Sequence, residues 1–218
     1  MSLAEVRVVI MIGGEMEKED FLRGQISTDD YLICADRGAD YAYKSGLKPK
    51  AIVGDFDSIS DEAKDFYKKS GCLFLSYPPE KDRTDTEIAM DYALERGARE
   101  LVITCALGGR VDHELGNIYL LEKLVKSGVK AKILSGRQII EVIVESTELH
   151  IRAGKTVSLF ALTDAVDGIT TKGLKYPLIN GRLSRGVSLG ISNELVADRA
   201  HLDIKDGSLL VVQTRGEG

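Results

Sequence analysis

The feature that most constrains the fold of this chain is an alternation, over its first two thirds, of short valine- and isoleucine-rich runs with segments of helical periodicity. Strands covered on both faces are continuously apolar, and helices connect parallel neighbours. The alternation therefore predicts an α/β fold, a mostly parallel sheet with helices on both faces. The expected strands are 6–12, 31–35, 51–53, 73–75, 101–106 and 129–134, and the expected helices are 39–45, 61–69, 85–96 and 114–126.

After about residue 140 the pattern changes, because no convincing helical periodicity remains. Short strand-like runs separated by glycine-containing turns are typical of a small antiparallel β-sandwich or barrel. We therefore expect two domains, an α/β domain over residues 1–144 and a smaller β-rich domain over 145–218. The expected C-terminal strands are 138–144, 147–152, 156–162, 169–172, 194–203 and 208–213.

Composition narrows the class of function. The net charge is −5, which argues against a nucleic-acid partner, since binding to phosphate backbones needs a basic face. No run approaches the roughly 18 apolar residues of a membrane span, and no secretory signal is visible. The three cysteines form no CxxC pair and lie in or beside apolar runs, as expected of buried thiols in a reducing compartment. We expect a cytoplasmic protein that binds a small ligand, with no membrane and no nucleic acid.

Aspartates follow the expected strands at their carboxyl ends, where open parallel sheets bind ligands. Asp36 follows the second strand, Asp55 and Asp57 the third, Asp85 the fourth, and Asp112 the fifth. Clustered carboxylates repel one another unless a cation neutralises them, and hard oxygen ligands beside phosphate suit Mg²⁺. Asp55 and Asp57 form the strongest pair for such a site. The alternative is an acidic turn in which Asp57 or its neighbour caps the next helix.

The fourth loop combines a helix start with charged groups. Thr84 and Glu87 have the spacing of a capping box, in which both side chains bind amides of the first helical turn. Asp85 is then left to reach a metal. Lys81 and Arg83, just before the cap, are placed to meet phosphate oxygens.

The fifth loop has the sequence GGRVDH over residues 108–113. Its glycine pair, with Gly109 next to the coming helix, lets backbone amides approach a phosphate closely. Arg110, Asp112 and His113 follow at once and strengthen the prediction of an anion site.

Other phosphate-binding and nucleophile motifs do not fit the sequence. Gly13 and Gly14 follow the first strand, but the full dinucleotide fingerprint is missing and no helix is expected directly after them. No Walker-type GxxxxGK[ST] and no nucleophile-elbow motif occurs. A P-loop kinase and a serine hydrolase are therefore not expected.

Taken together, the motifs resemble those of the thiamine pyrophosphokinase family, in the right order across nearly the whole chain. The resemblance implies transfer of a pyrophosphoryl group from ATP to the hydroxyl of thiamine, with AMP released. It also implies a homodimer, with an α/β catalytic domain, a β-rich thiamine-binding domain, and the thiamine site between subunits. The segments that carry it are ADRGAD (35–40), GDFDS (54–58), KDRTDTE (81–87), GGRVDH (108–113), GLKYPL (173–178) and SLGISNEL (188–195).

Site roles carry over from this resemblance by position. It implies that the carboxylates of Asp55, Asp57 and Asp85 hold Mg²⁺ and the ATP phosphates. Asp36 would lie near them and contact thiamine or metal, and Ser192 and Asn193 would meet the pyrimidine of thiamine. The residues implied to line the nucleotide site are Lys81, Arg83, Thr84, Gly109, Arg110, Asp112 and His113.

One departure from the family pattern concerns aromatic stacking. Some family members have a tryptophan in the segment that reads GLKYPL here, whereas this chain has no tryptophan and carries Tyr176. Two interpretations stay open for Tyr176, a ring that stacks on thiamine and a packing residue of the β domain.

Two alternative functions need separate tests. In a haloacid-dehalogenase-like phosphatase, Asp55 of the Asp-x-Asp motif would be the nucleophile and form an aspartyl phosphate. That motif normally lies on the first strand, however, and glycine and threonine follow it, whereas Ser58 follows Asp57 here. A non-catalytic thiamine or nucleotide sensor on the same fold would be expected to lack the carboxylates, and all of them are present.

Overall fold

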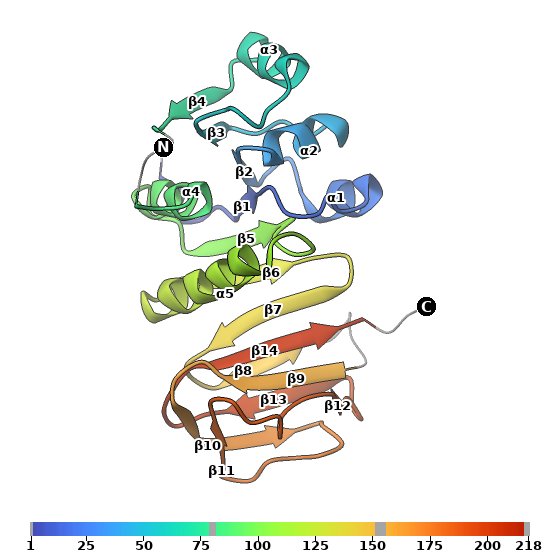
Figure 1. The fold of residues 1–218 in the computed structure, drawn as a ribbon. Helices are drawn as coiled ribbons and strands as arrows, with labels where there is room; N and C mark the ends of the chain where they lie inside the picture. Colours follow the sequence, from blue (N-terminus) through green and yellow to red (C-terminus); the bar gives the residue numbers. More distant parts are fainter. Residues whose placement is uncertain (1, 79–81, 151–155, 216–218) are drawn as a thin grey trace. The chain divides into compact units, whose positions relative to one another are not determined.

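The chain divides into two compact units in a computed structural model that describes residues 2–78, 82–150 and 156–215 (Figure 1). Unit 1 comprises Met1–Leu120 and Gly128–Gly136, and unit 2 comprises Leu121–Ser127 and Arg137–Gly218. The sequence predicts a boundary between an ATP-binding domain and a thiamine-binding domain at residues 144 and 145. That functional boundary stays a prediction.

Unit 1 contains the predicted parallel sheet. Its strands lie in the order β6-β5-β1-β2-β3-β4, and each neighbouring pair runs parallel. The central strands are fully buried because their sequences are continuously apolar. The bounds are β1 (Val8–Met11), β2 (Tyr31–Ala35), β3 (Ala51–Gly54), β4 (Leu73–Ser76), β5 (Glu100–Thr104) and β6 (Lys130–Leu134).

Helices cover both faces of this sheet, as predicted: α2 and α4 lie on opposite sides of it (Figure 1). One helix, α1, was not predicted, because it has only seven residues and buries only Leu22. The helices are α1 (Glu19–Gln25), α2 (Gly38–Lys44), α3 (Asp61–Lys69), α4 (Asp85–Leu94) and α5 (Val111–Lys126).

Unit 2 is an antiparallel β-sandwich, which confirms the predicted fold class. In one sheet β7 pairs with β14, β14 with β9, and β9 with β12, while the other has the order β11-β10-β13-β8. The core packs side chains from both sheets, such as Leu159 and Val211 from the first with Val166 and Leu202 from the second. The strands are β7 (Gln138–Ile143), β8 (Thr147–His150), β9 (Thr156–Ala161), β10 (Ala165–Lys172), β11 (Gly181–Ser184), β12 (Asn193–Glu194), β13 (Arg199–Asp203) and β14 (Leu209–Thr214).

Unit 2 differs from the prediction in two places. The run expected over 194–203 is split, because β12 belongs to one sheet and β13 to the other. Where the chain passes from one sheet to the other, Leu195 forms an isolated antiparallel β-bridge with Leu174. Strand β11 was missed because Leu183 is its one buried side chain, too weak a pattern to read.

Two general expectations concern thiols and membranes. Cys34 and Cys105 are free and buried, and burial raises the pKa of both thiols, as expected of small core residues. Cys72 is also free but only partly buried, so the expectation of a buried thiol was wrong there. Within the described ranges, no helix is long and apolar enough to cross a membrane.

Candidate active site

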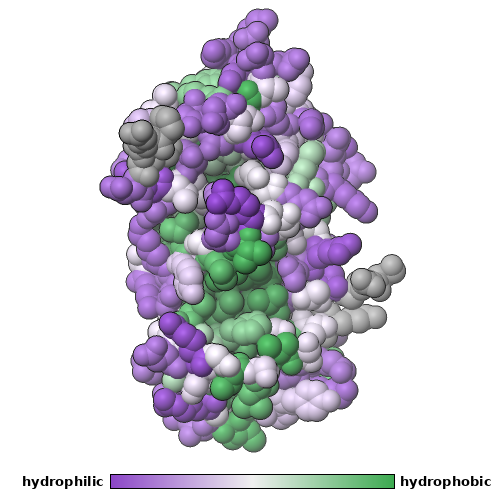
Figure 2. Space-filling model, viewed as in Figure 1, coloured by the Kyte–Doolittle hydropathy of each residue, from purple (hydrophilic) through white to green (hydrophobic). Residues whose placement is uncertain are grey.

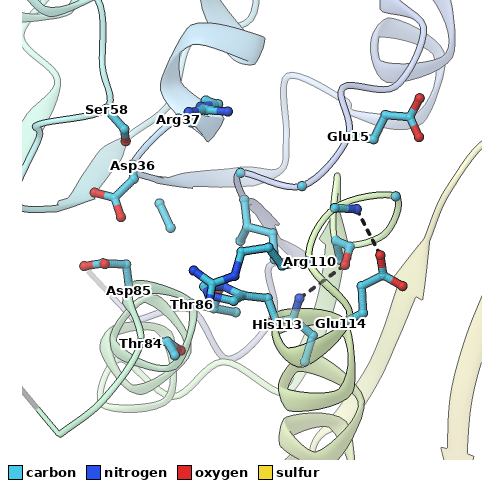
Figure 3. Close-up of a pocket in the computed structure, with 18 residues that line it drawn as sticks. Glu15, Asp36, Arg37, Ser58, Thr84, Asp85, Thr86, Arg110, His113 and Glu114 are labelled. Atoms are coloured by element: carbon cyan, nitrogen blue, oxygen red, sulfur yellow. Dashed lines mark hydrogen bonds between the residues drawn. The ribbon is translucent and has the colours of Figure 1, made fainter.

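A cavity of about 770 Å³ lies in unit 1 at the carboxyl ends of β1, β2 and β5 (Figure 3). The chain adds strands on one side of β1 up to β4 and then places β5 on its other side, so this is where the strand order reverses. Ligands of open α/β sheets bind at such a point. The predicted site residues that line the cavity are Asp36, Thr84, Asp85, Gly109, Arg110 and His113.

Asp36 is placed by an unusual backbone at the end of β2. Its φ of 44° lies in the left-handed region, which turns the chain directly from the strand toward α2. Its carboxylate packs against Gly54 so closely that a Cβ atom there would clash with it. Because Gly54 ends β3, this contact brings Asp36 next to Asp55, as the sequence predicts for neighbouring strand ends.

The GDFDS loop orders its own aspartates. Asp55 accepts a hydrogen bond on Oδ1 from the amide of Asp57 at 3.0 Å, which closes a local turn. The ring of Phe56 packs edge-on against Phe74 at 5.3 Å between centroids and holds the loop on β4. Neither aspartate is part of the cavity lining, whereas Ser58 is. Of the three predicted metal ligands, Asp85 alone lines the cavity.

The second aspartate of ADRGAD has a structural role. Asp40 accepts hydrogen bonds from both the amide and the hydroxyl of Ser60. Ser60 in turn caps α3 by accepting from the amide of Ala63 at 3.3 Å. This chain of contacts fixes α3 to α2 and so sets the path of the loop between β3 and α3.

The KDRTDTE segment places its members differently. Thr84 caps α4 by accepting from the amide of Glu87 at 3.2 Å, as predicted, and Asp85 lines the cavity from the first turn of that helix. Arg83 forms an ion pair with Asp91 at 2.8 Å and is not part of the lining. Lys81 lies outside the described residues.

The glycine loop after β5 is flanked by carboxylates. The Gly109 amide donates to Glu114 Oε1 at 2.9 Å, and the Glu15 side chain packs against Gly108 (Figure 3). Arg110 lines the cavity and forms an ion pair with Asp112 at 2.6 Å. The hydrogen bond from Arg110 lowers the pKa of Asp112. Asp112 itself is not in the lining, in contrast to His113 beside it.

Several lining residues were missed by the sequence reasoning. The segment after β1 reaches the cavity because the Gly14 amide donates to the Cys105 carbonyl at 2.8 Å, and no side chain would fit at Gly14. The rule that ligands meet strand ends applies to β1 too, so rejecting this glycine pair as a dinucleotide loop discarded a usable signal. The missed lining residues with polar side chains are Glu15, Arg37, Ser58, Thr86, Glu114 and Asn117.

The predicted thiamine-contacting residues lie in unit 2, where Asn193 ties two motifs together. Its Oδ1 accepts from the Tyr176 amide at 3.0 Å and its Nδ2 donates to the Tyr176 carbonyl at 2.7 Å. Ser192, with φ 57°, donates its amide to the hydroxyl of Ser158 at 3.0 Å. The GLKYPL and SLGISNEL segments are thereby joined.

The Tyr176 ring itself is 61% exposed. Its backbone is held on both sides by Asn193, while the ring projects from the surface of unit 2 with Lys175 Nζ 5.4 Å from its centroid. A ring that is mostly exposed is not a packing residue of its own sandwich. Stacking on a ligand therefore stays the open prediction for Tyr176.

Comparison with known families agrees with this arrangement. Residues 22–133 match the model of the thiamin pyrophosphokinase catalytic domain, and residues 141–209 match that of its vitamin B1 binding domain. The chain belongs to the thiamine pyrophosphokinase family. The catalytic-domain match begins within α1, ends within β6 and includes every residue that lines the cavity except residues 12–15 after β1.

Relatives from this family match over nearly full length. Thiamine pyrophosphokinase of Bacillus subtilis (strain 168) is 31% identical over 208 residues, covering 94% of this chain and 97% of that protein. A crystal structure of the Bacillus subtilis enzyme superposes with a TM-score of 0.89 at 29% identity, covering 97% of this chain and 100% of that one. One from Geobacillus thermodenitrificans gives 0.86 at 30% identity, covering 98% and 99%.

These matches decide between the alternatives drawn from the sequence. The chain is an enzyme of the family that makes thiamine diphosphate, with ATP as co-substrate. A phosphatase with Asp55 as nucleophile is not favoured, because both matching family models are those of thiamin pyrophosphokinase domains. A non-catalytic sensor is not favoured either, because Asp36 and Asp85 are both present at the cavity.

Proposed function

We propose that this chain carries out the pyrophosphoryl transfer from ATP to thiamine in the cavity of unit 1. The observation that supports this best is the lining of that cavity: Asp36 and Asp85 lie together on one side of it, Arg37 directly follows Asp36, and Arg110 reaches it from the loop before α5 (Figure 3). Carboxylates that hold a cation and arginines that meet phosphate are the groups that phosphoryl transfer requires.

The donor set fits Mg²⁺ bound together with nucleotide. Among the described residues, no three acidic, histidine or cysteine side chains form a ready-made metal site. Mg²⁺ usually takes one or two protein carboxylates and completes its shell with water and phosphate oxygens. We propose that Asp55, Asp57 and Asp85 supply these carboxylates, with Asp36 beside them. Bound there, Mg²⁺ would neutralise charge on the transferring group.

The protein's own part in the reaction is positioning and charge. In-line attack by the thiamine hydroxyl on the β-phosphorus needs the two reactants held in line, and a carboxylate that takes the hydroxyl proton. Arg110 and His113 at the start of α5, with Lys81 and Arg83 from the segment before α4, are proposed nucleotide contacts. Arg83 would have to leave Asp91 to make its contact.

Unit 2 is the proposed thiamine-binding part. We propose that Ser192 and Asn193 place the loop that meets the pyrimidine, and that the exposed Tyr176 ring stacks on the substrate. An aromatic face also suits the cationic thiazolium. The boundary at residues 144 and 145 belongs to this proposal.

We also propose that the enzyme is a homodimer with the thiamine site between subunits. Unit 2 exposes large apolar side chains that its own core leaves uncovered, and Figure 2 shows hydrophobic residues at the surface over β10 and β11. Such a patch is typical of an interface. Sedimentation that shows a stable, active monomer would contradict it. The exposed residues are Tyr176, Ile179, Val187, Leu189, Ile191 and Val196.

Product analysis tests the proposal. Purified protein with thiamine, ATP and Mg²⁺ is expected to form thiamine diphosphate and AMP in equal amounts, as separated by liquid chromatography. Formation of ADP with thiamine monophosphate, or release of orthophosphate alone, would contradict the proposed transfer. Omission of Mg²⁺ in the presence of a chelator is expected to stop the reaction.

A further inference from the structure

The arginines predicted to bind phosphate already have carboxylate partners. Arg83 is paired with Asp91 on α4 at 2.8 Å, two turns into the helix that follows it. Arg110 is paired with Asp112 at 2.6 Å, through two hydrogen bonds from its Nε and terminal nitrogen. A guanidinium in such a pair must exchange an internal anion for a phosphate oxygen, which reduces the net gain from binding.

The glycine loop is engaged in the same way. The Gly109 amide, predicted to bind phosphate, donates to Glu114 at 2.9 Å, and Glu15 packs against Gly108 from the other side. Two carboxylates therefore flank this turn. Like charges repel, so a phosphate that binds the Gly109 amide has to displace the Glu114 carboxylate first.

Arg37 is different. It lines the cavity, and within the described residues it forms no ion pair with a carboxylate. Its guanidinium lies near the buried phenol of Tyr41, where burial raises the pKa of the tyrosine and Arg37 opposes that rise. Arg37 interacts with the neutral Tyr41 side chain and not with a carboxylate, so it can meet a phosphate without exchanging an internal anion for it.

The backbone that carries Arg37 is held firmly. The left-handed Asp36 precedes it, and Gly38 after it is packed so tightly on the Met11 carbonyl that it leaves no room for a Cβ. The Arg37 Cβ itself comes within 3.2 Å of where a Cβ at Gly13 would lie. A side chain that projects from so fixed a point needs little reordering to meet a ligand.

The charge of the cavity lining also favours Arg37 as a phosphate contact. Four carboxylates and two arginines line the cavity, so the site is negative before a nucleotide enters it. Figure 3 shows Arg37 and Ser58 on one side of the cavity and Thr84 and Asp85 on the other. A phosphate chain between these sides would meet Arg37 directly. The four carboxylates are Glu15, Asp36, Asp85 and Glu114.

We propose that Arg37 binds the phosphates of the nucleotide in this cavity, a role that neither the motif spacing nor the family match assigns to it. The proposal rests on the proposed use of ATP at this site. Arg37 is then the cation that meets the phosphates first, while Arg83 and Arg110 need a partner exchange before they can bind.

The test is a titration of three adenine ligands into the full-length protein by calorimetry, with Mg²⁺ present. The ligands are α,β-methylene-ATP, whose α–β bridge is not cleaved, AMP and adenosine. Arg37→Ala is expected to weaken binding of the ATP analogue about 10- to 100-fold, because a charge-assisted hydrogen bond is lost. Adenosine, which has no phosphate, is expected to bind as it does to the wild type.

Two further variants guard against indirect effects. Arg37→Lys keeps the charge without the fork and is expected to lie between the wild type and Arg37→Ala. Arg23→Ala is the matched control, since Arg23 is paired with Asp20 and Glu19 on α1 away from the lining, and it should leave all three affinities unchanged. Thermal unfolding checks that each variant is folded.

Two results would overturn the assignment. In one, Arg37→Ala binds the ATP analogue as tightly as the wild type; in the other, it loses affinity for adenosine to the same extent. The product assay on the wild type separates this inference from the proposed function. If the wild type makes AMP and thiamine diphosphate while Arg37→Ala keeps full nucleotide affinity, only the role of Arg37 is wrong.

Discussion

Units 1 and 2 use their motif residues in opposite ways. In unit 1, Asp36 and Asp85 project from strand and helix ends into a cavity. In unit 2, the side-chain amide of Asn193 forms hydrogen bonds with the backbone of Tyr176, and the Ser192 amide donates to the Ser158 hydroxyl. A residue of a family motif can therefore serve either the chemistry or the fold. Which of the two it serves depends on whether its polar atoms face a cavity or bind the protein's own backbone.

The largest effect is expected from Asp85→Asn. Loss of a carboxylate at the cavity should lower kcat at least about 100-fold, since metal-bound charge stabilisation is worth several kcal/mol. The free energy of unfolding should fall by only about 0.5 kcal/mol, the value of a charge in the first turn of α4. Steady-state kinetics and urea denaturation measure both. Asp65→Asn on the exposed face of α3 is the control. Near-normal kcat in Asp85→Asn would contradict the chemical role of this carboxylate.

Asn193→Ala should show the reverse pattern. It removes three hydrogen bonds from a side chain that is only 8% exposed, so unfolding is expected to become easier by about 2 kcal/mol. The KM for thiamine should rise because the Tyr176 segment loosens, while the KM for ATP stays constant. Ser188→Ala, at an exposed position in the same segment, should change neither. If Asn193→Ala kept full stability but lost turnover, Asn193 would have a chemical role like that proposed for Asp85, and its structural role would be contradicted.

Tyr176→Ala is expected to raise the KM for thiamine up to about 10-fold with little change in kcat, because stacking on a cationic ring contributes of the order of 1 kcal/mol. Tyr176→Phe keeps the aromatic face and should behave like the wild type. Equal effects of the two substitutions would point to the hydroxyl group and contradict stacking. Stability should be unaffected, since the ring is exposed.

The smallest effect concerns an aspartate of unit 1 outside the strand ends. Asp30 accepts from Arg7 at 2.8 Å and from the Ser27 amide at 2.7 Å. Burial raises the pKa of Asp30, but these hydrogen bonds and the charge of Arg7 outweigh it, so the pKa is lowered overall. A lowered pKa stabilises the fold above the unfolded value near 4 and loses that contribution as pH falls through the folded value. Asp30→Asn should cost about 1 kcal/mol at pH 7 and close to nothing at pH 2, by urea denaturation, with kcat unchanged.

Much of unit 1 could be predicted because its signals are local. The apolar runs predicted β2 at its observed bounds, and helical periodicity predicted α3, although Ser60 caps this helix and not Asp57 or its neighbour Ser58 as the alternative interpretation had it. The five predicted site residues with side chains at the cavity, including Asp36 and Asp85, follow from the rule that strand ends meet at one edge.

The remaining features depend on contacts between distant segments. Glu114 and Glu15 meet the glycine loop only through the pairing of the segments after β1 and β5. Arg83 was expected to contact phosphate, but it forms an ion pair with Asp91, eight residues further on. Strand β12 joins a different sheet from β13 because of pairing partners far away in the chain. Such partner choices leave no periodic trace in a single sequence.

The measurement that tests the division between the two units most directly is a nucleotide titration followed by amide resonances of the isotope-labelled protein. With α,β-methylene-ATP and Mg²⁺, the amides of Gly13, Gly14 and Gly109 are expected to shift, while those of Tyr176 and Glu194 stay in place. Thiamine alone should shift the second pair. Nucleotide-induced shifts confined to Tyr176 and Glu194, with the glycines unchanged, would contradict the assignment of the phosphate chemistry to the cavity of unit 1.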